Sequence, residues 1–414
     1  MSMDFKPKSH EKIQQLLAKG VHIPNPATLD IGDDVHIDQI SGQGVTIYPG
    51  CRIYGGKTVI SSGCKLGYEA PATVEDCRLG QRVELKGGFF SKSIFLDKAT
   101  LGMGAHVREG CLLEEEAGGV HCVGLKQTIL FPFVTLGSLI NLCDCLMAGG
   151  TSRSNHSEVG SSYIHFNFTP EADKATPSLL GDVPRGVMLN QPPIFLGGQG
   201  GIIGPARLGY GNIVAAGSIL RHDYPQDGLL IFETRPAGGA KEFHPSAYPN
   251  LRRVVENNIL YLANLSALES WYRHVRKPFL EARPLGSLLY AGVLETLASA
   301  GKERLKRLRA MAEKAAAFSG PDTRARKELL GQTGFCEDLF TGNIPDVFTA
   351  TRPLREVFLE DFAKSAQNST DYVGVIRNLP GTVSLKGTAW LNGIVRALGD
   401  RAAQALPLME LFKN

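Results

Sequence analysis

The sequence predicts a left-handed parallel β-helix followed by an all-α domain, and three observations lead to this fold class. Aliphatic residues recur every six positions between residues 30 and 222. Thirty-five of the 47 glycines precede position 250, and the apolar residues take helical spacing after Pro236. We therefore divide the chain into an N-terminal amphipathic arm at 1–28, a β-helix at 29–235 and a helical domain at 236–414.

The six-residue period is clearest in IGPARLGYGNIVAAGSIL, where the aliphatic positions are Ile202, Leu208, Val214 and Leu220. The same register appears at Leu101, Val107 and Leu113, and again at Leu130, Leu136 and Leu142. A helix repeats every 3.6 residues and a strand every two, so a spacing of six fits one flat side of a triangular coil. We expect the aliphatic residues to point into the coil, and small residues such as Cys51, Cys64 and Cys111 to fill its crowded corners.

The second half of the chain carries helical periodicity. Apolar residues follow helical spacing over 251–275, and further helical stretches are expected at 285–299, 301–318, 353–367 and 386–404. Two charged runs are predicted to be solvated surface segments. This interpretation is preferred to a phosphate contact for the basic run over 302–309, and to acid catalysis for the acidic run Glu114, Glu115 and Glu116.

Composition excludes several classes of protein. The net charge of +3 gives no strong attraction to nucleic acid or to an anionic membrane. No run approaches ~18 uninterrupted apolar residues, and the N-terminal residues lack the apolar core of a signal peptide. The eight cysteines form no CxxC pair, so we expect free thiols, no metal site and a cytoplasmic location.

Several segments resemble one enzyme family. Residues 104–223, about a third of the chain, are similar to the acetyltransferase domain of the bifunctional glucosamine-1-phosphate acetyltransferase/N-acetylglucosamine-1-phosphate uridyltransferase. The similar segments are AHVREG, GLKQT, GSSYIHFNFTPEADKAT and GNIVAAGSILRHD. The resemblance implies that substrate is bound by Arg108, Lys126, Asn167 and Lys174, and acetyl-CoA by Ala215, Ala216 and Arg221.

The chain departs from this family in two respects. The glycine-rich nucleotide loop of the uridyltransferase half has no counterpart before residue 30, so uridyl transfer is not expected of this chain. In the segment GSLINLCDC, Ser138 stands where the family has its catalytic histidine, and Asn141 where it has a tyrosine. A serine has no pKa near neutrality and cannot replace a general base. The candidate bases are then His156 and His165, and Arg153 beside His156 is a candidate ligand for phosphate or carboxylate.

The function expected from the resemblance is acetyl-CoA-dependent N-acetylation of an amino sugar phosphate or a sugar nucleotide by a homotrimer. One alternative is a non-catalytic member that binds a sugar nucleotide or scaffolds partners through its helical domain. Another is a structural solenoid that polymerises end to end. A zinc carbonic anhydrase of the same fold would need three converging histidines, and His121, His156 and His165 lack that family's close downstream pair.

Overall fold

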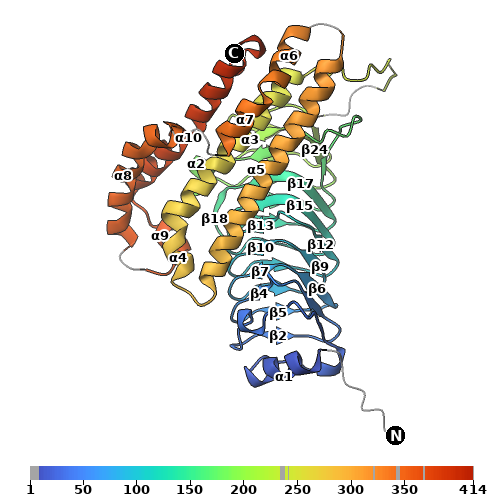
Figure 1. Cartoon of the computed structure of the whole chain (residues 1–414), viewed down its shortest axis with the longest axis vertical. Coiled ribbons are helices and arrows are strands. Elements are labelled where there is room, and N and C mark those ends of the chain that lie inside the picture. Colours follow the sequence, from blue (N-terminus) through green and yellow to red (C-terminus); the bar gives the residue numbers. More distant parts are fainter. Residues whose placement is uncertain are drawn as a thin grey trace.

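The computed structural model describes residues 9–233, 238–240, 242–319, 322–341, 346–366 and 369–413. Its first part is a left-handed parallel β-helix, and its second part is a set of helices that lie along one side of that β-helix (Figure 1). The predicted fold class is therefore confirmed. No helix in the described part of the chain is both long and apolar enough to span a bilayer.

Each coil of the β-helix supplies one short strand to each of three flat faces. Face 1 contains β1 (Asp30–Ile31), β3 (Arg52–Tyr54), β6 (Ala72–Glu75), β9 (Gly88–Ser91), β12 (Ala105–Val107), the first halves of β15 (Val123–Leu130) and β17 (Ile140–Met147), β21 (Ile164–Phe166), β24 (Gly201–Ile203) and β27 (Ile219–Leu220). Face 2 contains β4 (Val59–Ile60), β7 (Arg78–Leu79), β10 (Ile94–Phe95), β13 (Leu112–Leu113), the second halves of β15 and β17, β22 (Ser178–Leu180) and β25 (Arg207–Leu208). Face 3 contains β2 (Thr46–Ile47), β5 (Lys65–Leu66), β8 (Glu84–Leu85), β11 (Thr100–Leu101), β14 (Gly118–Gly119), β16 (Thr135–Leu136), β20 (Glu158–Val159), β23 (Phe195–Leu196), β26 (Ile213–Val214) and β28 (Leu230–Ile231).

The interior is filled by one aliphatic side chain per strand, as the six-residue period predicts. Leu208, Val214 and Leu220 are at most 3% exposed and point inward. Cys64 and Cys111 are fully buried, and burial raises the pKa of both thiols to about 12. A thiol with so high a pKa stays protonated near neutrality, which fits a packing role and not a redox role.

Three excursions leave the coils, and one of them is the segment 167–177 between β21 and β22. The antiparallel hairpin of β18 (Gly150–Ser152) and β19 (Asn155–His156) projects from the corner between faces 2 and 3. The short helix α2 (Val183–Gly186) follows β22, and its first turn is capped by the Asp182 carboxylate, which accepts from the Arg185 N–H. At the N-terminal end, α1 (His10–Ala18) buries Ile13 and Leu16.

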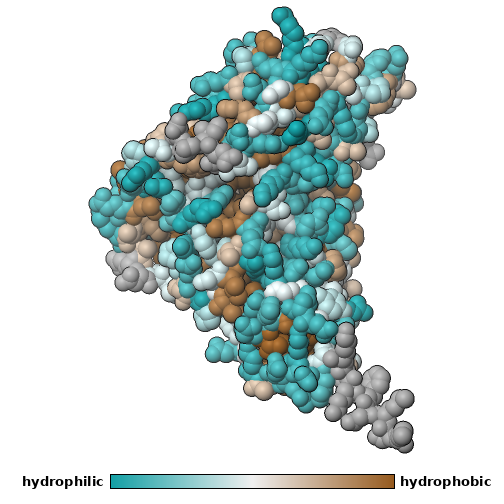
Figure 2. Space-filling model, in the orientation of Figure 1, coloured by the Kyte–Doolittle hydropathy of each residue, from teal (hydrophilic) through white to brown (hydrophobic). Residues whose placement is uncertain are grey.

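The helical region covers face 2. Its long helices α3 (Leu251–Trp271) and α5 (Gly286–Ala317) run along the β-helix, and α5 contacts β7 and β10 while α3 contacts β22 (Figure 1). Figure 2 shows that the outer side of these helices is mainly hydrophilic. The other helical elements are a π-helical turn (Tyr272–Arg276), α4 (Lys277–Glu281), α6 (Thr323–Gly331), α7 (Thr333–Phe340), α8 (Asp346–Ala366), α9 (Tyr372–Arg377) and α10 (Gly381–Ala405).

Apolar residues and buried ion pairs join the helices to face 2. The outward side chains of Ile94, Leu112, Ile129, Leu146 and Leu179 are all at most 5% exposed because the helices cover them. Burying such apolar side chains is worth roughly 1.5–3 kcal/mol each. The two halves of the chain therefore share one continuous core.

The prediction that the acidic run is solvated was wrong for two of its three residues. Glu114 and Glu115 are buried, where Glu115 pairs with Arg276 at 2.6 Å and Glu114 accepts from the Tyr272 hydroxyl. The basic run was also partly misinterpreted, because Arg304 is 2% exposed and pairs with Asp144 at 2.8 Å. Each of these charges is buried against a partner on the other half of the chain. The residues next to it in sequence therefore did not indicate that it is buried.

Candidate functional site

Face 1 of the β-helix carries Asn141 and, in a second row, Arg108 and Lys126, three positions that the family resemblance singles out. His106 on β12, Gly124 on β15 and Asn141 on β17 are in register on three successive coils. Val107, Leu125 and Leu142 alternate with them and fill the interior, so His106 and Asn141 point outward. Gly124 has no side chain between them, and a Cβ there would have its nearest contact at 3.5 Å. The row therefore contains a shallow notch flanked by an imidazole and an amide.

A second outward row on face 1 is basic. Lys126 is in register with Cys143, and Arg108 occupies the corresponding position on the coil before. Lys126 pairs with Glu109 at 2.8 Å, and this hydrogen bond lowers the pKa of the Glu109 carboxyl. Burial raises the pKa of the Cys143 thiol, while the charges of Arg108 and Lys126 oppose the rise. The structure thus brings together the two cations expected to contact phosphate.

An imidazole lies beside the position where the family's catalytic histidine is replaced. Ser138 Oγ is 3.1 Å from His121 Nδ1, a hydrogen bond between neighbouring coils at the corner before face 1. The Ser138 N–H donates to Ser161 Oγ at 3.1 Å, which fixes the backbone of this corner. Val120 and Leu139, next to this pair in sequence, are 51% and 56% exposed. The pair therefore lies at an accessible, partly apolar corner.

His165 lies inside the β-helix. It is on β21, is 5% exposed, and its Nε2 forms a 2.8 Å hydrogen bond with Ser178 Oγ on face 2. Burial lowers the pKa of His165 to about 4, so the imidazole is neutral at pH 7. These contacts span the interior between two faces, and the ring does not reach the outer surface of face 1.

Asn167 joins the end of β21 to the helical region. Its Nδ2 donates to Asp144 at 3.1 Å, and its Oδ1 accepts from the Thr176 hydroxyl at 2.9 Å. Asp144 in turn pairs with Arg304 of α5. Lys174, on the same excursion from the coil, is exposed. The amide of Asn167 is therefore occupied by protein partners, and the ammonium of Lys174 is accessible.

His156 and Arg153 lie on the β18–β19 hairpin, at the corner of the triangle opposite face 1. The Arg153 guanidinium donates to Glu116 O, Phe133 O and Thr135 Oγ1 at 2.9–3.2 Å, which holds the hairpin against the coils below. His156 Nδ1 is 2.8 Å from Arg153 O. Within one chain, these two residues are not brought together with Arg108 and Lys126.

The residues expected beside acetyl-CoA lie near the C-terminal end of the β-helix. Ala215 and Ala216 follow β26 at the corner from face 3 to face 1, and Arg221 follows β27 on face 1. The Arg221 guanidinium donates to Ile219 O at 2.7 Å. Next to this corner, face 3 has a row of exposed apolar side chains in register, formed by Phe195, Ile213 and Leu230.

Two imidazoles, His106 and His121, were not predicted as catalytic candidates. The two-residue alternation in AHVREG carried a signal for His106, because Val107 points inward and so places His106 and Arg108 on the same outward side. No local signal linked His121 to Ser138, since the two are 17 residues apart and meet only through stacking of coils. The three histidines of the carbonic anhydrase alternative lie apart: His121 is at a corner, His156 is on the hairpin, and His165 is inside the β-helix. Within the described ranges, no cluster of three or more His, Cys, Asp or Glu side chains is arranged to hold a metal ion.

Comparison with known proteins supports the resemblance found in the sequence. The chain is similar to the bifunctional protein GlmU of Thermotoga maritima, with 26% identity over 225 residues that cover 54% of this chain and 45% of the relative. It is also similar to GlmU of Fervidobacterium nodosum (27% over 223 residues, 54% and 44%) and of Trichlorobacter lovleyi (26% over 221 residues, 53% and 43%). No family model matches the chain. The similarity spans less than half the length of each of these relatives, and this chain resembles their acetyltransferase domain.

Proposed function

We propose that this protein is an acyltransferase that uses acetyl-CoA to N-acetylate an amino sugar phosphate or a sugar nucleotide. The observation that carries the proposal is the pair Arg108 and Lys126, which stand on adjacent coils of an exposed β-helix face in a chain similar to GlmU. Two cations on neighbouring strands, which are about 4.8 Å apart, suit the oxygens of one phosphate group. The acceptor sugar then lies along face 1 over the notch at Gly124.

N-acetylation also requires a proton acceptor near the amine. We infer that His121 fills this role, because its Nδ1 lies 3.1 Å from the Oγ of Ser138, the residue that stands where the family has its catalytic histidine. His156 is an alternative base if the hairpin of a neighbouring copy approaches face 1. For His165 we propose a structural role, since its ring is enclosed between faces 1 and 2.

We further propose that three copies assemble around the corner between faces 3 and 1. Face 2 is covered by the helices, which leaves faces 1 and 3 for contact between copies. The corner and the adjoining strand expose Val120, Leu139, Ile164 and Phe166. A closed threefold ring buries this strip equally in every copy and places each candidate site beside a neighbour.

A second candidate function is a non-catalytic sugar-nucleotide binder. It is favoured by Ser138 at the expected histidine position and by the enclosure of His165. In this alternative, Arg108 and Lys126 bind phosphate as proposed above, but acetyl-CoA is not a ligand.

Thermal shift measurements with separate ligands distinguish the two functions. The acyltransferase proposal expects acetyl-CoA and glucosamine-1-phosphate each to raise the Tm of the wild type. Arg108→Ala and Lys126→Ala should lose the shift with glucosamine-1-phosphate and keep the shift with acetyl-CoA. Arg52→Ala is the matched control, because it removes an exposed cation from face 1 several coils away and should keep both shifts. A shift with UDP-N-acetylglucosamine and none with acetyl-CoA would favour the binding module.

A further inference from the structure

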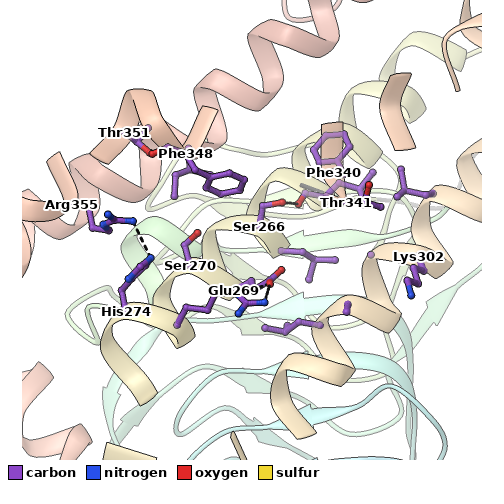
Figure 3. Close-up of a pocket in the computed structure, with 18 of the residues that line it drawn as sticks. Ser266, Glu269, Ser270, His274, Lys302, Phe340, Thr341, Phe348, Thr351 and Arg355 are labelled. Carbon is purple, nitrogen blue, oxygen red and sulfur yellow. Dashed lines mark hydrogen bonds and ion pairs between the residues drawn. The ribbon is translucent and has the colours of Figure 1, made fainter. Parts of the chain in front are cut away.

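The helical region contains a cavity of about 460 Å³ that lies away from face 1 (Figure 3). This volume falls within the range of small-molecule sites, roughly 300–1,000 Å³. The cavity is lined by α3, the π-helical turn, α5, the end of α7, α8 and α10, and it is partly open to solvent. Helices from the whole length of the second half of the chain therefore build it.

One part of the wall is apolar and aromatic. Phe340 and Phe348 lie on one side of the space, and Leu262, Leu265 and Trp390 form further parts of its lining (Figure 3). Trp390 is 1% exposed and lies 6.4 Å from Trp271, ring centre to ring centre. This surface suits the apolar body of a ligand.

The other part of the wall is cationic. Arg273, Lys302 and Arg355 line the cavity together with His274, and Glu269 is the acidic residue among the lining side chains. Glu269 is already occupied, since Arg273 donates to it at 2.6 and 2.8 Å. Among the side chains that the structure describes, neither Arg355 nor Lys302 forms an ion pair with a carboxylate.

The partner of Arg355 is unusual for a guanidinium. Its Nη1 is 3.1 Å from His274 Nε2, so the imidazole must be neutral to accept this hydrogen bond. Burial lowers the pKa of His274, and the charges of Arg355 and Arg273 lower it further. Arg273 and His274 belong to the π-helical turn, and such turns recur at functional sites.

We propose that this cavity binds a small amphipathic anion, with a carboxylate or phosphate head held by Arg355 and an apolar body packed against Phe340 and Phe348. An anionic head supplies the negative charge that the wall lacks, and a planar guanidinium can bind either head group through two parallel hydrogen bonds. Lys302 faces the same space from α5, across the cavity from Arg355 (Figure 3). The helical region is thus a ligand-binding unit in its own right.

Eight-carbon probes on the full-length chain test the proposal. Octanoate and octyl phosphate carry the two candidate heads, while octanol and octylammonium carry the same chain with no charge or a positive charge. Binding is followed by tryptophan fluorescence, because Trp390 lines the cavity and the chain has two tryptophans. We expect one of the anions to bind at least tenfold more tightly than octanol and octylammonium. Equal affinity for octanoate, octyl phosphate and octanol, or no fluorescence change with either anion at millimolar concentration, would overturn the proposal.

Three variants locate the binding. Arg355→Ala should weaken binding of the anion about tenfold or more. Arg352→Ala is the matched control on the same helix, since Arg352 pairs with Glu356 and does not line the cavity, and it should leave the affinity unchanged. Gly301→Leu adds a side chain to the wall of the cavity, at a position where a Cβ would meet nothing within 4 Å.

Gly301→Leu should abolish binding while the Tm stays equal or rises, since leucine favours a helix more than glycine does. Because Gly301→Leu is expected to remain folded, it tests the site even if Arg355→Ala unfolds. Normal binding by Gly301→Leu, or equal losses in Arg355→Ala and Arg352→Ala, would show that the anion does not occupy this cavity.

Discussion

At the scale of single residues, His165 gives the protein a predictable response to pH. Its pKa is lowered to about 4 in the folded chain and returns to about 6.5 on unfolding. Between these values the unfolded state binds more protons, so the contribution to stability is complete above pH 6.5 and is lost as the pH falls through 4.

Glu114 acts in the opposite direction, because burial and the neighbouring Glu115 raise its pKa to about 7. It binds more protons in the folded state, so its contribution decreases as the pH rises from about 4.5 to 7. Comparing wild type with His165→Gln cancels this effect, since Glu114 is present in both. We expect the free energy of unfolding of the wild type to approach that of His165→Gln below pH 6.5, by up to about 1.4 kcal/mol per pH unit. Urea unfolding of both proteins between pH 7 and 4.5 measures this difference. A difference that does not change with pH would mean that His165 titrates normally in the folded chain.

The proposed base is also a claim about one residue. His121→Ala should lower kcat by ~10²–10⁴-fold and leave the affinity for acetyl-CoA unchanged, because a proton acceptor is removed and no binding group is lost. Steady-state kinetics with His106→Ala and His156→Ala measured alongside identify the base. Full activity in His121→Ala with loss in either of the other two would move the assignment to that residue.

At the scale of elements, the seam between face 2 and the long helices carries much of the stability. Leu112 is fully buried by the helices although it points away from the β-helix interior. Leu112→Ala should lower the free energy of unfolding by about 2–5 kcal/mol, measured by denaturant titration. Leu385→Ala is the control, because Leu385 is 70% exposed on α10, and it should change stability by less than about 0.5 kcal/mol. A small effect of Leu112→Ala would mean that the helices detach readily from face 2.

The same seam shows how far the sequence predicts elements. The six-residue period located the inward side chains, because every six residues place one side chain in the interior of the coil and that side chain must be apolar. It did not identify the covered face, although the strand pairs Ile94–Phe95, Leu112–Leu113 and Ile129–Leu130 are apolar on both sides, as a strand buried on both faces requires. The partners Asp144–Arg304 could not be predicted, because each charge alone is compatible with a solvated surface.

At the scale of the whole molecule, the proposed trimer depends on the exposed corner between faces 3 and 1. Light scattering at micromolar concentration should give three times the monomer mass of 44.7 kDa. Leu139→Asp should shift the population toward monomers, because a carboxylate in an apolar contact is costly to desolvate. Leu354→Asp is the control, because it makes the same substitution at an exposed leucine on α8, away from the corner between faces 3 and 1. It should leave the mass unchanged. A monomeric wild type would also remove His156 as an alternative base.

The similarity to GlmU covers about half of the chain. The candidate site could be predicted from the sequence only where side chains follow the register of the coils. Arg108 and Lys126 meet because they occupy equivalent positions on adjacent coils, which the spacing of the repeats allows one to anticipate. The cavity among α3, α5, α8 and α10 depends on how helices distant in sequence pack, and no motif marks it.

The release of free thiol from acetyl-CoA tests acyl transfer most directly. With wild-type protein, acetyl-CoA and glucosamine-1-phosphate or another amino sugar phosphate, we expect thiol release that depends on the acceptor. Arg108→Ala and Lys126→Ala should lower kcat/KM for the acceptor, while Arg52→Ala should match the wild type. Absence of acceptor-dependent thiol release with every amino sugar phosphate and sugar nucleotide tried, from a protein that still binds UDP-N-acetylglucosamine, would contradict the acyltransferase proposal.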